Sequence, residues 1–505
     1  MMNRRAFLQR AGLGAAASLE AAQLQQRLPP EGTGHNPALN GLGTQYKGQP
    51  AGHHIPDPEV PKQPNILWIF GDQFRAQALS FNGDPNSRTP NLQRSDVNGV
   101  NFTANLSGFP LCCPFRGSLL TSRYPHHCVP GHEYPLPEGQ KTIADVFNEN
   151  GYDTAYVGKW HLGGFHEYNG RAAFFITDPN RRGGFQHWTG YENNNSQWDC
   201  WVHGGSGKDA FHYRLPGYET DALTDLTIDY LKKQGEAKKN GHGKPFFAVL
   251  SVQPPHDPFV APAKFMANYE AAKLELRPNT AHVTRVTERA RTELAGYYAQ
   301  IENLDWNYGR IIQALTDTGQ LENTHVFFFA DHGDSLGSHG MFRKVNPYEE
   351  AIRTPMIISG GLPTYDGWKR GRLPVLSNAV DIAPTTLGLC NLKKPEWMEG
   401  TDYSHYRVQK PPAGPEPDSA YLQNVIPVGH PDSINTPYRG LVTKDGWKFV
   451  AFENQSWLMF NLNEDPYEEA NLAQNNAFRA ERKRLLGRLS QWVADTGDKF
   501  ELPSD

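Results

Sequence analysis

The stretch Leu111-Cys112-Cys113-Pro114-Phe115-Arg116-Gly117-Ser118-Leu119-Leu120-Thr121-Ser122-Arg123 decides how the rest of the chain is interpreted. Pro114 suits the first turn of a helix, because its fixed φ fits and its missing N–H would have no partner there. Cys112 is therefore predicted to lie just before a helix N-terminus, where free N–H groups and the helix dipole favour an anion and lower a thiol pKa. Arg116 adds a fork-shaped cation that suits a tetrahedral oxyanion. Spacing alone leaves two hypotheses open, a reactive cysteine and a buried structural cysteine.

The pattern Cys-x-Pro-x-Arg followed by Leu-Leu-Thr resembles the signature of the type I sulfatases, a family of the alkaline-phosphatase-like superfamily. In that family the cysteine is oxidised to formylglycine (3-oxoalanine), so the resemblance implies that Cys112 is the modified residue. Cys113 does not fit the spacing. The chain departs from the usual pattern at Phe115, where a small residue is common, and at Ser122, where glycine is common.

The composition limits the class of protein. The 505 residues are enough for one large domain and a smaller one. A net charge of −5 argues against nucleic acid or an anionic membrane as a partner, and no apolar stretch approaches the length of a membrane span. The five cysteines are too few and too scattered for a disulfide scaffold, although a Cys113–Cys128 pair stays open.

The N-terminus has the pattern of a targeting segment. Arg4 and Arg5 precede a mild apolar run, which resembles a twin-arginine signal; a basic N-terminal helix is the alternative. We assign residues 1–22 to this signal and residues 23–63, rich in Pro, Gly, His and Asn, to a linker or arm. Such a signal implies the twin-arginine export machinery and a bacterial periplasmic or secreted location. A formylglycine-generating enzyme would act before export.

Polar side chains follow four apolar runs that have the length of buried strands. In an open α/β sheet, ligands gather at the carboxyl ends of the strands. Carboxylate and amide oxygens suit a divalent cation, whereas each of these residues taken alone is typical of a cap or a solvated surface. The residues are Asp72 and Gln73 after residues 64–70, Lys159 and His161 after residues 154–157, His256 after residues 244–252, and Asp331 and His332 after residues 324–330.

The surrounding motifs also resemble sulfatase blocks, from residue 64 onward. They include Asn65-Ile66-Leu67, Thr89-Pro90-Asn91-Leu92, Gly158-Lys159-Trp160-His161-Leu162-Gly163, Pro254-Pro255-His256, Asp331-His332-Gly333 and Lys344. The resemblance implies one calcium ion, with manganese or magnesium as alternatives, held by Asp72, Gln73, Cys112, Asp331 and His332. It implies that a hydroxyl of hydrated formylglycine attacks the ester sulfur. It further implies that His161 holds the hydrate. Lys344 or His256 would protonate the leaving alcohol. Charge on the sulfuryl group would be neutralised by Arg116, Lys159, His256 and Lys344.

The expected fold is α/β, with a central mixed, mostly parallel sheet flanked by helices over residues 64–400. This is the sulfatase or alkaline-phosphatase-like fold. Residues 401–505 are expected to form a small C-terminal subdomain, with antiparallel strands near 438–442, 448–453 and 457–462 and a terminal helix over 479–493.

Residues 165–220 are interpreted as an irregular region rich in aromatic side chains. Aromatic faces beside polar neighbours, such as Trp188 and Trp201, suit sugar rings; a structured surface excursion is the alternative. Arg353 and the glutamates before it are expected to form structural ion pairs.

The sequence thus predicts a sulfatase that cleaves sulfate esters, on a carbohydrate or a small molecule. One alternative is a phosphonate monoester or phosphodiester hydrolase on the same scaffold. Another is a catalytically inactive, secreted sugar-binding relative.

Overall fold

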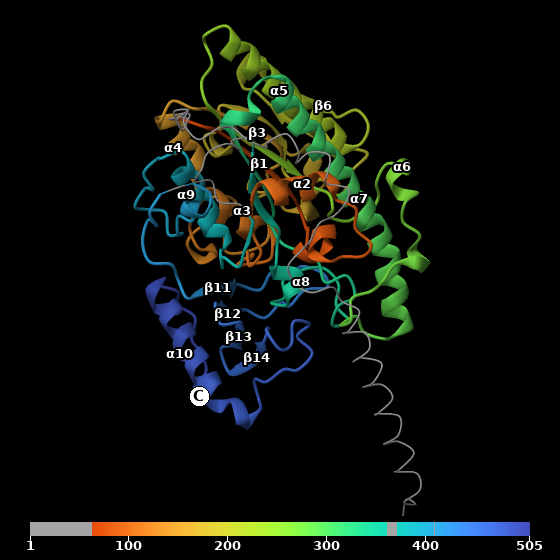
Figure 1. Cartoon of the computed structure of the whole chain (residues 1–505), viewed down its shortest axis with the longest axis vertical. Helices are drawn as coiled ribbons and strands as arrows, with labels where there is room; N and C mark the ends of the chain where they lie inside the picture. Colours follow the sequence, from red (N-terminus) through yellow and green to blue (C-terminus); the bar gives the residue numbers. More distant parts are fainter. Residues whose placement is uncertain (1–62, 361–370, 409, 505) are drawn as a thin grey trace, which may run out of the picture. The chain divides into compact units, whose positions relative to one another are not determined.

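A ten-stranded sheet forms the centre of the molecule (Figure 1). The computed structural model describes residues 63–360, 371–408 and 410–504. The strand order is β10-β2-β9-β8-β1-β7-β3-β4-β5-β6. From β8 to β4 all neighbours are parallel, and antiparallel pairs follow on both sides, so the predicted mixed, mostly parallel sheet is confirmed. The parallel group is β8 (Thr324–Ala330), β1 (Asn65–Gly71), β7 (Phe246–Val252), β3 (Asp153–Lys159) and β4 (His187–Tyr191). The other strands are β2 (Val100–Phe102), β5 (Trp201–Gly204), β6 (Phe211–Arg214), β9 (Met356–Ser359) and β10 (Gly371–Leu373).

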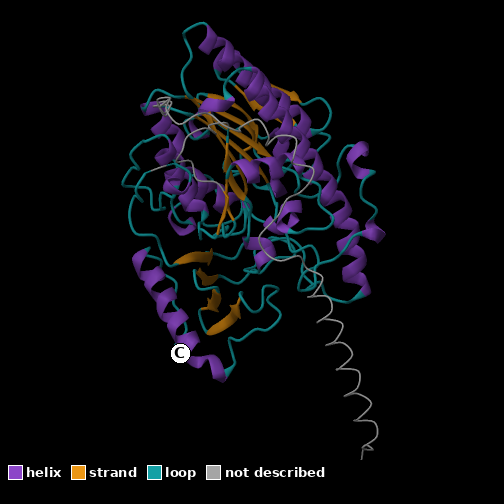
Figure 2. Cartoon of the chain, viewed as in Figure 1, coloured by secondary structure: helices purple, strands orange, loops and turns teal. Residues whose placement is uncertain are grey.

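Helices cover both faces of this sheet (Figure 2). Side chains of β1 alternate between two hydrophobic clusters, because successive residues of a strand point to opposite faces. Leu67 and Ile69 join the cluster that includes α2 (Pro90–Asn98), α5 (Glu219–Lys239) and α7 (Thr284–Asp317). Ile66, Trp68 and Phe70 join the cluster formed with α3 (Cys112–Thr121), α4 (Ile143–Glu149) and α9 (Ala379–Leu389). Two short helices are α6 (Ala263–Met266) and α8 (Glu349–Ile352).

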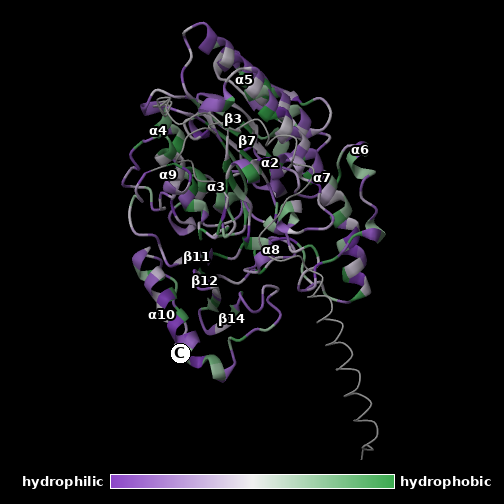
Figure 3. Cartoon of the chain, viewed as in Figure 1, coloured by the Kyte–Doolittle hydropathy of each residue, from purple (hydrophilic) through white to green (hydrophobic). Residues whose placement is uncertain are grey.

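The C-terminal part contains a second, smaller sheet, drawn in blue in Figure 1. It is antiparallel, in the order β11-β12-β13-β14, and the helix α10 (Arg479–Asp495) packs on it through Leu485, Leu489 and Trp492. In Figure 3 the helices α7 and α10 carry both hydrophilic and hydrophobic residues, as expected of helices that cover a core. Three strands and the terminal helix are therefore as predicted, while β11 was not expected. The strands are β11 (Ser419–Asn424), β12 (Tyr438–Thr443), β13 (Trp447–Phe452) and β14 (Gln455–Asn461).

The interpretation of residues 165–220 as irregular is only partly right. Three short strands, β4, β5 and β6, extend the central sheet here. Trp188 is only 5% exposed and packs with Tyr156 and Trp160, so its ring belongs to the core. Trp201 is half-buried and contacts Phe174. Strands of four or five residues contain too few alternations of polar and apolar residues to be predicted from sequence. They form here because they hydrogen-bond to neighbouring strands of the sheet.

Other expectations have mixed outcomes. Arg353 does form an ion pair with Glu349, at 2.7 Å. Cys113 and Cys128 are separate buried free thiols, so no disulfide joins them.

Among the described residues, none of the helices combines the length and the apolar character that a membrane span requires. The signal (1–22) and almost all of the linker (23–63) lie outside the described residues, and the boundary at residue 400 stays a prediction.

Candidate active site

The polar residues predicted at the strand ends lie together at one edge of the central sheet. Gly71 at the end of β1 pairs with Val252 of β7 and with Ala330 of β8, so these strands end at the same level. Asp72 and Asp331 follow directly, and Lys159 is the last residue of β3. All three side chains are completely buried.

Cys112 is the first residue of α3, and its thiol points into this cluster. Its Sγ lies 3.4 Å from Asp72 Oδ1, 3.3 Å from His332 Nε2 and 3.3 Å from Lys344 Nζ. One ligand atom from each of Asp72, Cys112, Asp331 and His332 lies within 4.8 Å of the others. Two carboxylates and an imidazole around so small a space fit a divalent cation. The structure therefore brings together four of the residues predicted to hold a metal.

The thiol of Cys112 is not activated as the helix N-terminus predicted. Burial and the neighbouring Asp72 raise its pKa to about 11, which outweighs Lys344 and Lys159. The expectation of a lowered thiol pKa is therefore wrong for this environment, because loss of solvent outweighs the dipole of one helix.

Two buried cations hold the carboxylates. Lys159 Nζ lies 2.8 Å from Asp72 Oδ2, and Arg116 Nη2 lies 3.2 Å from the same oxygen and 3.5 Å from Asp331 Oδ2. Arg116 also donates to the Lys159 carbonyl and to Ser251 Oγ, both at 2.8 Å. Burial alone would raise the pKa of Asp72, but Lys159 and Lys344 hold it well below its usual range. The pKa of Asp331 is raised to about 7 by burial and by Asp72.

Gln73 links Lys344 to the carboxylates. Its Oε1 accepts from Lys344 Nζ at 2.9 Å, its Nε2 donates to Asp334 Oδ2 at 2.6 Å, and its backbone N–H donates to Asp331 Oδ1 at 2.9 Å. Its φ of 69° lies in the left-handed region, which costs energy and is common at functional sites. Asp334 was not assigned a role from sequence, although it stands two residues after His332.

The two remaining predicted histidines are His161 and His256, and both are buried. Both ring nitrogens of the buried His161 lack a hydrogen-bond partner among the described residues. His256 Nδ1 lies 2.7 Å from the carbonyl of Asp257. Burial and Lys344 lower the pKa of His256 to about 4, so its ring is neutral at pH 7.

Comparison with known proteins gives the family of this chain. Residues 64–392 match the family model described as sulfatase. The chain belongs to the sulfatase family. Residues 337–495 also match the model described as N-sulphoglucosamine sulphohydrolase, C-terminal.

Similar proteins support this family assignment. An ulvan-active sulfatase from Formosa agariphila is 34% identical over 464 residues, which covers 88% of this chain and 83% of that protein. An endo-4-O-sulfatase from Bacteroides thetaiotaomicron is 28% identical over 504 residues, 88% of this chain and 96% of that protein. The crystal structure of a putative sulfatase from Bacteroides fragilis shares 27% identity at a TM-score of 0.76, and the match covers 88% of this chain and 98% of that one. The predicted family, fold and enzyme class, a hydrolase of sulfate esters, are confirmed.

Two buried glutamates of this sulfatase accept hydrogen bonds from residues next to the site. The sequence analysis identified neither of them. Glu192 accepts hydrogen bonds from the N–H groups of Gly163 and Gly164, just after His161. Glu219, the first residue of α5, accepts from Tyr191 Oη at 2.6 Å and from the N–H of Gln253 at 2.8 Å, both on Oε1. Isolated glutamates outside a motif give no signal, because their role depends on residues far away in the chain.

Gly333 lies at a close approach between two backbone segments just after His332. A Cβ atom at this position would lie 1.9 Å from the carbonyl oxygen of Glu350, so only glycine lets the backbone pass. The turn after His332 is thereby fixed.

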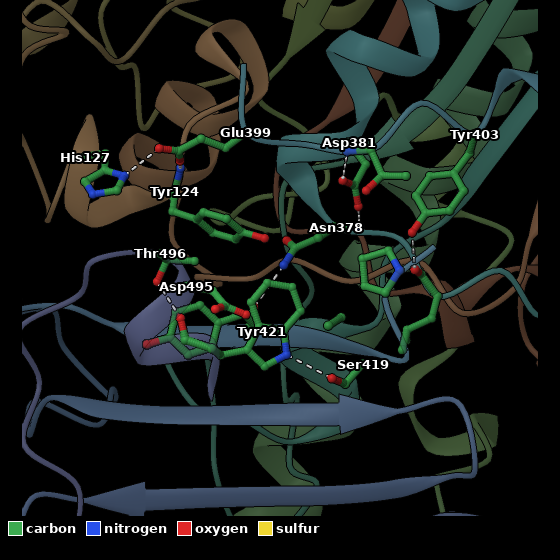
Figure 4. A pocket seen from close by; sticks show the side chains of 15 residues that line it. Tyr124, His127, Asn378, Asp381, Glu399, Tyr403, Ser419, Tyr421, Asp495 and Thr496 are labelled. Atoms are coloured by element: carbon green, nitrogen blue, oxygen red, sulfur yellow. Dashed lines mark hydrogen bonds and ion pairs between the residues drawn. The ribbon is translucent and has the colours of Figure 1, made fainter. Parts of the chain in front are cut away.

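A separate cavity of about 370 Å³ lies between the C-terminal part and the region after α3 (Figure 4). Tyr124, Asp381, Tyr421 and Trp492 line it, and Trp492 donates to Ser419 at 2.8 Å. None of the predicted site residues lines this cavity. The cavity is therefore distinct from the strand-end cluster of predicted site residues.

Proposed function

We propose that this sulfatase removes sulfate esters from a carbohydrate, with a formylglycine nucleophile made from Cys112. The observation that carries the proposal is the convergence of Asp72, His332 and Lys344 on Cys112 Sγ, at 3.3 to 3.4 Å. The carbohydrate is supported by the names of similar proteins, an ulvan-active sulfatase and an N-acetylglucosamine-6-O-sulfatase, the latter 24% identical.

A single divalent cation, calcium in our proposal, would be held by Asp72, Gln73, residue 112, Asp331 and His332. The clustered carboxylate oxygens and imidazole support this, since hard oxygen ligands suit calcium; manganese and magnesium are the alternatives. When bound, such an ion favours ionisation of a hydroxyl at residue 112 and polarises the sulfate group.

The side chains around residue 112 then have separate roles. In the unmodified chain, Cys112 Sγ stands where a hydroxyl of hydrated formylglycine would be. Lys344, 3.3 Å away, and Lys159 present positive charge to the sulfuryl oxygens, which stabilises charge that develops in the transition state. Arg116 acts through the carboxylates of Asp72 and Asp331, which it contacts directly.

Lys344 is proposed as the acid that protonates the leaving alcohol. Burial alone would lower its pKa, but Cys112 and Asp72 raise it above the ordinary value, so the side chain is protonated at pH 7. His256 is neutral at that pH and is assigned to sulfate binding. His161, whose ring nitrogens have no partner in the described part of the chain, is assigned to the formylglycine hydrate.

Maturation and export belong to the same proposal. A formylglycine-generating enzyme would modify Cys112, and the Arg4-Arg5 segment would direct export to the periplasm or the exterior.

The test is peptide mass spectrometry across residue 112, combined with activity, on protein co-expressed with a formylglycine-generating enzyme. We expect an aldehyde at residue 112, an intact Cys113, and hydrolysis of an aryl sulfate that is absent from Cys112→Ala. Faster hydrolysis of a phosphonate monoester than of the sulfate would favour the alternative hydrolase. An unmodified, inactive protein that still binds glycans would favour the sugar-binding alternative.

A further inference from the structure

A second cluster of metal-ligating side chains lies beside the active site. Cys113 follows Cys112 in α3, and its Sγ lies within 4.8 Å of one ring nitrogen each of His132 and His161. Cys113 is completely buried, His161 is 2% exposed and His132 is half-buried. None of the three belongs to the proposed calcium ligands.

The histidines of this cluster have unfilled hydrogen-bonding capacity. Neither ring nitrogen of His161 has a partner among the described residues, and neither does Nδ1 of His132. A buried polar group without a partner costs about 1–3 kcal/mol. His161 also has a φ of 54°, in the left-handed region. Three buried nitrogens beside a thiol therefore indicate that the space between them accepts a ligand.

We propose that Cys113, His132 and His161 form a binding site for one zinc ion. Thiolate sulfur and imidazole nitrogen are the ligands that zinc prefers, and one cysteine with two histidines leaves a fourth position open for solvent. Calcium prefers oxygen ligands, so it does not compete for this site.

Glu133 supplies the outer contacts that such a site needs. Its Oε1 lies 3.7 Å from His132 Nε2, which leaves Nδ1 for the metal. Its backbone N–H donates to Cys113 Sγ at 3.3 Å, which partly offsets the burial that raises the pKa of the Cys113 thiol well above its usual value, so the thiol loses its proton when the metal binds. Its carboxylate is fixed by His166 Nδ1 at 2.9 Å and by the N–H of Glu167 at 2.8 Å. Carboxylates often accept a hydrogen bond from a metal-bound histidine at zinc sites, and here Glu133 lies at ion-pair distance from His132.

Zinc at this position would inhibit the enzyme. The ion would bind a ring nitrogen of His161, the side chain that the proposed function assigns to the formylglycine hydrate. This consequence rests on the proposed function, whereas zinc binding itself does not.

Cobalt, which takes the place of zinc and reports sulfur ligation by a charge-transfer band, gives the direct test. We use the full chain with Cys112→Ala, saturated with calcium, so that Cys113 is the only thiol at the site. We expect one cobalt ion per chain, a sulfur-to-cobalt band, and its loss when zinc is added. Cys113→Ser should abolish the band, while Cys128→Ser, a matched change at another buried free thiol, should retain it. Glu133→Gln should weaken zinc binding by about 10–100-fold.

The proposal would be overturned if the Cys112→Ala protein showed no sulfur-to-cobalt band. It would also be overturned if the band persisted after Cys113→Ser. If Cys113→Ser does not fold, as judged by circular dichroism, His132→Ala replaces it and should weaken zinc binding at least about tenfold. Because the Cys112→Ala protein cannot form formylglycine, these results do not depend on sulfatase activity. For the mature enzyme in saturating calcium, Cys113→Ser should raise the zinc concentration for half inhibition at least about tenfold; equal sensitivity would contradict the inhibitory role.

Discussion

Replacing Glu219 by glutamine should stabilise the protein at pH 8 and have little effect at pH 5. Glu219 is completely buried, and burial raises its pKa from 4.5 to about 7 despite the hydrogen bonds from Tyr191 and Gln253. Both hydrogen bonds end on Oε1, and Oε2 has no partner among the described residues. Glutamine therefore keeps both bonds and places its NH₂ group where Oε2 lies.

The magnitude follows from the two pKa values. The folded protein binds the proton of Glu219 more tightly than the unfolded chain, so this group stabilises the fold below pH 4.5. That contribution is lost as the pH rises through about 7. At about 1.4 kcal/mol per pKa unit, the full contribution is about 3 kcal/mol, of which about 2.5 kcal/mol is lost between pH 5 and pH 8. Glutamine does not titrate, so the variant avoids this loss.

The assay is urea denaturation of both proteins at pH 5 and pH 8, followed by tryptophan fluorescence. The free energy of unfolding of the variant, minus that of the parent, should rise by about 2–3 kcal/mol between the two pH values. Glu464→Gln, at an exposed glutamate, is the control and should show no such rise. If the Glu219→Gln difference is the same at both pH values, or falls, the argument from burial is wrong.

Three further predictions concern the site and its support. Lys344→Met should lower kcat on an aryl sulfate by about 10²–10³-fold, because it removes a cation 3.3 Å from residue 112; a change in KM alone would contradict its role as the acid. Asp331→Asn should reduce the bound calcium, measured by elemental analysis after dialysis, while His256→Ala, the control, should leave the calcium content unchanged. Equal calcium contents in the two variants would exclude Asp331 as a ligand. Trp188→Ala should reduce the free energy of unfolding by about 3–5 kcal/mol, measured in urea, because it empties a core position; a stable variant that lost only glycan turnover would restore the sugar-binding interpretation.

The sequence by itself predicted which polar residues lie together at the strand ends. Lys159 ends one apolar run, Asp331 directly follows another, and His256 stands four residues after a third. Such runs are recognisable without knowledge of their neighbours. Parallel strands end at the same edge of a sheet, so chemistry at the end of each run predicts one shared site. Pro114 likewise placed the start of a helix correctly within two residues, because a proline acts on its own backbone.

Only the tertiary structure decided the electrostatics of that site and the residues behind it. The thiol pKa of Cys112 depends on burial and on Asp72, 40 positions earlier, and no local pattern contains either fact. Glu219 gained its role from Tyr191, the last residue of β4, and from Gln253, the residue after β7. The strands β4 to β6 exist through hydrogen bonds to their neighbours rather than through their own periodicity. Pairing, burial and charge interactions between distant segments arise only when the chain is folded. For this reason the sequence predicted the candidate site residues but could not assign their protonation or the residues that support them.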